Sequence, residues 1–197
     1  MVDQILLYIS AAGDLIPERE ALSQAVVEIP VTLGWRIIQS PYKGEPVNPD
    51  AVTAADVHLL LLGSDIRAPI GLEWLYSRRF GRLPVLFLKQ DIQRTMAAQN
   101  FMHHIEAQTT WHLFKNSSDL SQQVLKLLAS HILERANYYA LSTKERDRLT
   151  SWQDELNASG TKNIEDIRGG AGESSVILSP ERYIPSEGVL IQPKEDD

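Results

Sequence analysis

The fold of this chain follows from one stretch, Ala55 to Lys89, which reads ADVHLLLLGSDIRAPIGLEWLYSRRFGRLPVLFLK. Residues 57–62 form an almost unbroken apolar run, which is typical of a strand covered on both faces of a sheet. A second apolar run at 85–88 has the same character. Two such strands with a helix between them predict a parallel pair joined by a right-handed crossover.

The segment between these strands has the signals of a turn followed by a helix. Gly63 to Asp65 supply turn residues, and Pro69 can open a helix because its missing N–H would be unpaired there anyway. Gly81 and Pro84 end that helix. We expect Glu73 in the helix's first turn, just beyond the carboxyl end of the first strand, where open α/β sheets bind their ligands.

The rest of the chain continues the alternation of strands and helices. We expect further strands at 5–9, 35–39 and 110–114. Further helices are expected after Asp14 as far as Pro30, over 50–55, after Asp91 as far as His104, and from Ser117 or Ser118 to about 132. Asp14 and Asp91 are the expected N-caps of their helices. This alternation predicts the α/β class. The expected architecture is a doubly wound parallel five-stranded sheet in the flavodoxin-like order 2-1-3-4-5.

Two additional parts follow this domain, to which we assign residues 1–140. Residues 141–159 carry an apolar stripe at helical spacing, and Ser142 and Glu145 have the spacing of a capping box, so we expect an added helix. Residues 160–197 hold five of the eleven glycines and four basic against eight acidic residues, which predicts a glycine-rich acidic tail. Two short apolar runs in the tail are expected to pair as strands, 176–178 and 189–191.

Composition argues against several classes of protein. A net charge of −7 and a pI near 5.2 disfavour a DNA- or RNA-binding protein, which needs a basic surface for phosphates. The absence of cysteine excludes thiolate metal sites and cysteine nucleophiles, and it fits a reducing compartment. No apolar run approaches the roughly 20 residues that span a bilayer. We therefore expect a cytoplasmic protein with neither membrane nor nucleic-acid partners.

Three segments, taken in order, resemble one protein family. They are YISAAGDLIPEREAL at Tyr8 to Leu22, the Gly71 to Glu73 helix with the strand that follows it at 81–88, and an aromatic strand leading into an amphipathic helix at 111–128. Together they are similar to a bacterial domain of unknown function that belongs with the Toll/interleukin-1-receptor-like and nucleoside deoxyribosyltransferase-like folds. The resemblance covers about residues 1–136. It implies a nucleotide- or NAD-related function of the signalling or defence type.

The resemblance also implies roles for individual residues. In the related enzymes a glutamate on this helix attacks or stabilises the anomeric carbon of an N-glycosidic bond, and Glu73 matches its position. Departure of the base leaves an oxocarbenium-like cation, which a nearby carboxylate stabilises. Tyr8 resembles a first-strand tyrosine that positions the carboxylate or the sugar, and Asp65 lies near an aspartate that touches the sugar or base. NAD or a nucleotide is then the substrate or ligand, and no cofactor is required.

The remaining candidate ligands come from the residues themselves, and four of the candidates also have a simpler explanation. Ser10 to Gly13 present backbone N–H groups at a helix entrance, which suits phosphate or ribose hydroxyls, and Arg67 can meet a phosphate. A helix dipole favours Glu73 without any function, and Tyr8 can be a core aromatic. Asp65 is a common turn residue, and Arg67 can be an ordinary exposed arginine. Two adjacent histidines, His103 and His104, point in different directions on a helix, so we expect no metal site.

Two functional hypotheses remain open. One is a nucleotide- or NAD-binding domain that cleaves an N-glycosidic bond through Glu73. The other is a non-catalytic interaction module, with a protein partner or a second copy bound through the 141–159 helix. Geometry distinguishes them: Tyr8, Asp65 and Glu73 should converge on one open cleft in the first case, whereas Trp74 or Tyr76 should fill that space in the second.

Overall fold

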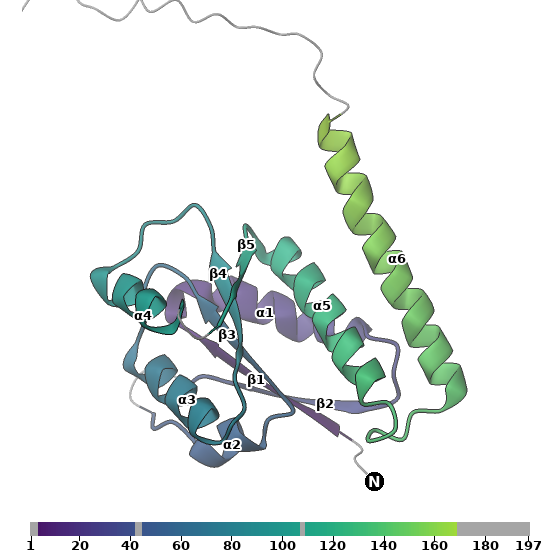
Figure 1. The fold of residues 1–197 in the computed structure, drawn as a ribbon, viewed down its shortest axis with the longest axis horizontal. Helices are drawn as coiled ribbons and strands as arrows, with labels where there is room; N and C mark the ends of the chain where they lie inside the picture. Colours follow the sequence, from purple (N-terminus) through teal and green to yellow (C-terminus); the bar gives the residue numbers. More distant parts are fainter. Residues whose placement is uncertain (1–3, 42–44, 107–108, 169–197) are drawn as a thin grey trace, which may run out of the picture. The chain divides into compact units, whose positions relative to one another are not determined.

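The computed structural model describes residues 4–41, 45–106 and 109–168, with side chains described as far as residue 158 (Figure 1). The tail strands expected at 176–178 and 189–191 lie outside the described residues. No helix within the described residues combines the length and the apolar character needed to cross a membrane.

Strands and helices alternate along the described chain. The strands are β1 (Gln4–Ala11), β2 (Gly34–Gln39), β3 (Val57–Leu62), β4 (Val85–Lys89) and β5 (Trp111–Phe114). The α-helices are α1 (Ile16–Ala25), α2 (Pro49–Ala54), α3 (Ala68–Arg79), α4 (Met96–Glu106), α5 (Ser117–Glu134) and α6 (Thr143–Arg168), and the 3₁₀ turns are η1 (Gly13–Leu15) and η2 (Val26–Glu28). The predicted α/β class is confirmed.

The five strands form one parallel sheet in the order β2-β1-β3-β4-β5, which confirms the predicted topology. Every residue of β3 is buried, as its unbroken apolar run indicates for a central strand covered on both faces. Register places Tyr8 of β1 beside Ile38 of β2 and His58 of β3. All the carboxyl ends therefore meet at one edge of the sheet, and all the amino ends at the other.

Helices cover both faces of the sheet (Figure 1). Helices α1 and α5 pack on one face, where their apolar side chains join Leu59, Leu61 and Phe87 in the largest core cluster. Helices α3 and α4 contribute to the smaller clusters around Leu60 and Leu62, and α2 contributes to the cluster that contains Tyr8. The side chains of β3 thus alternate between the two cores, which is the period of two expected for a strand.

The added helix α6 packs its first part onto the α1–α5 side of the domain. Leu149 is fully buried in the largest core cluster, and Trp152 and Leu156 pack against that cluster. The predicted capping box is confirmed, because the Ser142 backbone N–H donates to Glu145 Oε2 (3.0 Å) and the Glu145 backbone N–H donates to Ser142 Oγ (3.3 Å). The apolar stripe that suggested a partner surface is therefore partly used within this chain.

Both predicted aspartate caps are wrong. The turn η1 separates β1 from α1, so Asp14 lies inside that turn, where its carboxylate accepts from the backbone N–H of Ser64 (2.6 Å). Gly63 permits this contact, because a Cβ at that position would clash with the Asp14 carboxylate. Asp91 has a left-handed φ of 56°, and α4 begins only at Met96. Both aspartates therefore lie in turns at the edge of the sheet and not at the N-caps of the helices.

The expected place of Glu73 in the first turn of its helix is also wrong. Helix α3 begins at Ala68 and has no acidic residue in its first turn. Glu73 instead lies one turn further on, fully buried among residues that face the sheet. The helix dipole acts mainly on the first turn, so it does not explain this carboxylate.

Candidate functional site

The Glu73 carboxylate is held by hydroxyl groups from two neighbouring strands. Tyr8, on β1, donates its phenolic hydrogen to Oε1 at 2.8 Å. Ser40, immediately after β2, donates its hydroxyl hydrogen to Oε2 at 2.7 Å, and it accepts from the Ala11 backbone N–H at 3.2 Å. Glu73 has no exposed surface and Tyr8 is 1% exposed, so these contacts lie inside the protein.

A buried histidine continues this polar network. Ser10 Oγ lies 2.7 Å from His58 Nε2, and Ser77 Oγ lies 2.5 Å from His58 Nδ1. Ser77 follows Glu73 by four residues on α3, so both point from one face of that helix toward the sheet. The Tyr8 ring meets the His58 ring edge-on, with 5.3 Å between the ring centroids. A helix and two adjacent strands are therefore joined by buried hydrogen bonds.

Burial controls the protonation of these groups. It raises the pKa of the Glu73 carboxyl, and the hydroxyl groups that donate to the carboxylate and the Arg19 charge oppose that shift. Burial, together with the negative charge of Glu73, also raises the pKa of Tyr8 above its usual value. Burial lowers the pKa of His58 to about 3, so the imidazole is neutral at pH 7.

A pocket of about 310 Å³ opens at the carboxyl edge of the sheet. It is lined by the end of β1, the residues after β2, one side of α1 and the beginning of α3. The strand order reverses between β1 and β3, and ligands of doubly wound sheets bind at such a switch point. The volume falls at the lower end of the range for small-molecule sites, roughly 300–1,000 Å³.

Two arginines give the pocket a positive lining. Arg19 is nearly buried; it donates through Nε to Gln39 Oε1 at 2.9 Å and through Nη2 to the Ser40 carbonyl at 3.2 Å. Arg67 is exposed, and among the described residues its guanidinium has no hydrogen-bond or ion-pair partner. The Arg67 guanidinium lies beside Gly13, since a Cβ at that position would be in ordinary van der Waals contact with Arg67 Nη1 at 3.5 Å.

Glu73 lies behind the wall of this pocket. Ser40 lines the pocket and donates to Glu73, whereas Glu73 and Tyr8 are not among the lining residues. One serine side chain therefore separates the buried carboxylate from the pocket.

The structure brings some of the predicted site residues together and leaves others apart. Tyr8 and Glu73 are in contact, and Ser10 belongs to the same buried network through His58. Asp65 accepts from Thr95 Oγ1 at 2.6 Å, at the start of α4. Tyr8, Asp65 and Glu73 therefore do not converge on one open cleft.

The other predicted ligands, Gly13 and Arg67, both line the carboxyl-edge pocket. Trp74 and Tyr76, the two bulky residues that the interaction-module hypothesis expected to fill the cleft, lie elsewhere. Trp74 packs in the cluster around Leu60, and Tyr76 packs against the cluster that contains Tyr8. Neither of them lines the pocket, so the pocket is open although the glutamate is sealed.

Sequence reasoning did not identify Ser40, Ser77 or Arg19 as parts of this site. For two of them a signal exists. Ser77 follows Glu73 at helical spacing on a buried face, and Arg19 precedes Leu22 by three residues on the apolar face of α1. Ser40 has no such signal, because only the pairing of β2 with β1 brings it to Glu73.

Comparisons with protein-family models, with curated proteins and with solved structures give no match for this chain. Among the described residues, no three acidic or histidine side chains are grouped in a way that would hold a metal ion.

Proposed function

We propose that this protein binds a nucleotide, such as NAD, in the carboxyl-edge pocket. The observation that carries the proposal is the placement of two arginines, Arg19 and Arg67, around a pocket at the switch point of the sheet. A guanidinium fork matches phosphate oxygens in a bidentate manner, and charge-assisted hydrogen bonds of this kind are among the strongest in proteins. The pocket is apolar at Ile16, Pro69 and Ile70, which suits the base or ribose of the ligand.

The two arginines have different tasks in this proposal. Arg19 is already oriented by Gln39 and Ser40, so it supplies a fixed positive charge without losing side-chain freedom on binding. Arg67 closes on the phosphate, and it stands at the N-cap of α3, where the helix dipole also favours an anion. A nucleotide of this kind would serve a signalling or defence role as a sensed ligand.

The proposal predicts that Arg67→Gln weakens nucleotide binding by roughly tenfold or more, because one charge-assisted contact is lost. Isothermal titration with AMP, adenosine and NAD measures this effect, and adenosine should bind more weakly than AMP. Arg148→Gln is the matched control, since Arg148 lies on α6 among residues of another surface hollow. Equal affinities for AMP and adenosine, or an unchanged Arg67→Gln, would reject the proposal.

A second candidate function is cleavage of the N-glycosidic bond of the bound nucleotide. The observation that favours it is the position of the Glu73 carboxyl, which accepts from Ser40 in the wall of the pocket. In this reaction the bond between ribose and nicotinamide breaks and the base leaves with the electron pair. A carboxylate stabilises the resulting oxocarbenium-like cation, and water adds to the anomeric carbon with loss of a proton.

Glycosidic cleavage predicts that the wild-type protein releases nicotinamide from NAD, or a base from a nucleoside, and that Glu73→Gln does not. Chromatography of the reaction mixture measures the released base. Binding should survive in Glu73→Gln, because the arginines that hold the phosphates are unchanged. Binding without release in the wild type would leave a nucleotide-binding module that does no chemistry.

A further inference from the structure

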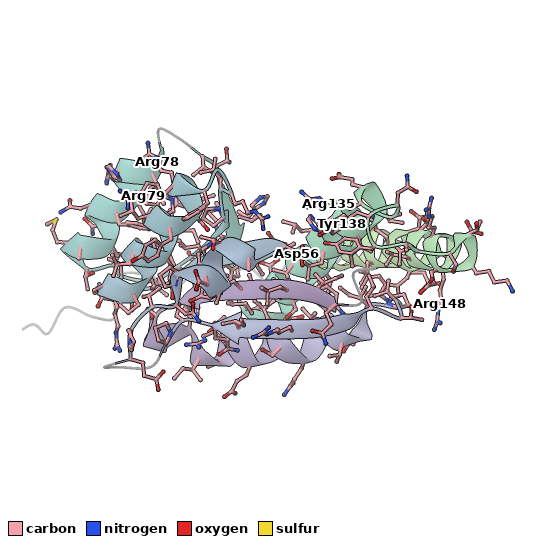
Figure 2. All side chains as sticks on the ribbon, turned by 90° about the horizontal axis from the view of Figure 1, so that it is seen from below. Asp56, Arg78, Arg79, Arg135, Tyr138 and Arg148 are labelled. Atoms are coloured by element: carbon pink, nitrogen blue, oxygen red, sulfur yellow. The ribbon has the colours of Figure 1, made fainter. Side chains whose placement is uncertain are left out.

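A second pocket lies at the opposite, amino-terminal edge of the sheet. Its volume is about 320 Å³, and it is formed by the start of β3, the turn between α3 and β4, and the last turns of α5. Figure 2 labels two of its lining residues, Asp56 immediately before β3 and Arg135 immediately after α5. None of the residues assigned above to nucleotide binding lines this pocket, so it forms a separate site.

The polar lining of this pocket is dominated by arginine. Arg82 Nη1 donates to the Ala55 carbonyl at 2.6 Å, which fixes the guanidinium at the pocket and leaves its other N–H groups available. Arg135 caps the carboxyl end of α5 and is exposed. In the part of the chain that the structure describes, neither guanidinium forms an ion pair, although both line the same hollow.

The charged side chains that line the pocket carry a net positive charge, and the Glu134 carboxylate, which also acts on His131, is not among them. The Asp56 carboxylate lines the pocket and accepts from the Leu6 backbone N–H at 2.9 Å, so it offsets one of the two positive charges. His131 also lines the pocket, and its pKa is lowered by burial and by the charge of Arg135, so it is neutral at pH 7. Two guanidinium groups and one carboxylate therefore surround the space.

The turn before β4 sets the position of Arg82. Gly81 has a left-handed φ of 70°, its N–H donates to the Arg78 carbonyl at 3.1 Å, and the Arg82 N–H donates to the Ser77 carbonyl at 2.9 Å. This is the Schellman arrangement that ends a helix. The same turn exposes Leu83 at the pocket, so one rigid connection supplies both a cation and an apolar wall.

The size and walls of the pocket indicate more than a bare inorganic ion. Apolar side chains from three elements, Leu83, Val85 and Leu127, line it beside the arginines. A phosphate or carboxylate group fills only a fraction of 320 Å³, and the remaining space faces these apolar walls. Pockets that combine apolar walls with a few convergent polar groups are typical of small organic ligands.

We propose that the amino-edge pocket binds a small organic anion, with its carboxylate or phosphate group held by Arg82 and Arg135 and its apolar body against Leu83 and Leu127. The chemistry common to both anionic groups is a set of oxygens that accept two guanidinium forks. This site is independent of the nucleotide proposal, because it uses other residues at the other edge of the sheet.

Titration of the full chain with phenyl phosphate, benzoate and the neutral benzyl alcohol tests the proposal. At least one of the two anions should bind at least tenfold more tightly than benzyl alcohol, and the difference between phenyl phosphate and benzoate identifies the preferred anionic group. Inorganic phosphate should bind more weakly than phenyl phosphate, because it leaves the apolar walls uncovered. The imidazole NMR signals of His131 should shift during the titration.

Variants locate the binding at this pocket. Arg135→Gln should weaken anion binding about tenfold, and it should leave the fold intact because Arg135 is exposed. Arg79→Gln is the control, since Arg79 is an exposed arginine of α3 that does not line the pocket (Figure 2). The proposal is overturned if no anion binds at millimolar concentration, or if Arg135→Gln binds as tightly as Arg79→Gln.

Discussion

Acidification from pH 7 to pH 4 is expected to reduce the free energy of unfolding by about 3 kcal/mol through His58. Burial lowers the pKa of this histidine from 6.5 to about 3 in the folded protein. At these pH values the His58 imidazole therefore binds a proton in the unfolded chain but not in the folded protein. The stability that His58 contributes is complete above pH 6.5 and is lost as the pH falls toward 3.

His58→Gln tests this prediction, because glutamine can bond to Ser10 and Ser77 but does not titrate. Urea unfolding at pH 7, 5 and 4 should show a smaller loss of stability in this variant than in the wild type. His103→Gln is the control, since it replaces an exposed histidine on α4 by the same residue type. If His58→Gln has the same acid sensitivity as the wild type, the imidazole is not the buried group that resists protonation.

Glu73→Leu is expected to destabilise the protein at pH 7 by about 3 kcal/mol. Leucine removes the acceptor of Tyr8 and Ser40, and a buried polar group left without its partner costs about 1–3 kcal/mol. Glu73→Gln should cost much less, because its side-chain oxygen still accepts and hydroxyl groups can rotate. Urea unfolding measures both variants, with Glu20→Gln on the exposed side of α1 as control.

The raised pKa of Glu73 gives the opposite pH dependence from that of His58. The folded protein holds a proton on this carboxyl above pH 4.5, where the unfolded chain releases it. The contribution of Glu73 to stability is therefore complete below pH 4.5 and falls as the pH rises through the folded pKa. In the His58→Gln background, adding Glu73→Gln should flatten this fall, and equal slopes in the two proteins would contradict it.

The sheet was predictable because its signals are local. The apolar runs 57–62 and 85–88, the turn residues between them and Gly81 at the helix end all act over a few neighbouring residues. Alternation of such units leaves few topologies open, since parallel crossovers are right-handed. The observed order β2-β1-β3-β4-β5 is one of these few topologies.

The predicted aspartate caps were wrong for a physical reason that rules based on neighbouring residues do not include. Asp14 has the chemistry of a helix cap, but it bonds to Ser64, which lies 50 positions further along the chain. An aspartate satisfies whichever backbone N–H the tertiary structure brings to it, and here that donor lies in the turn after β3.

Sequence alone determined the class of fold, the strand order and the edge at which Gly13 and Arg67 now line a pocket. Tertiary structure decided which polar groups are open and which are sealed. Tyr8 lies 65 positions from Glu73 and Ser40 lies 33 from it, so no local pattern reports that their hydroxyl groups occupy both oxygens of the carboxylate. The solvent accessibility of a polar atom is decided by tertiary packing, because it depends on which side chains from distant elements lie against that atom.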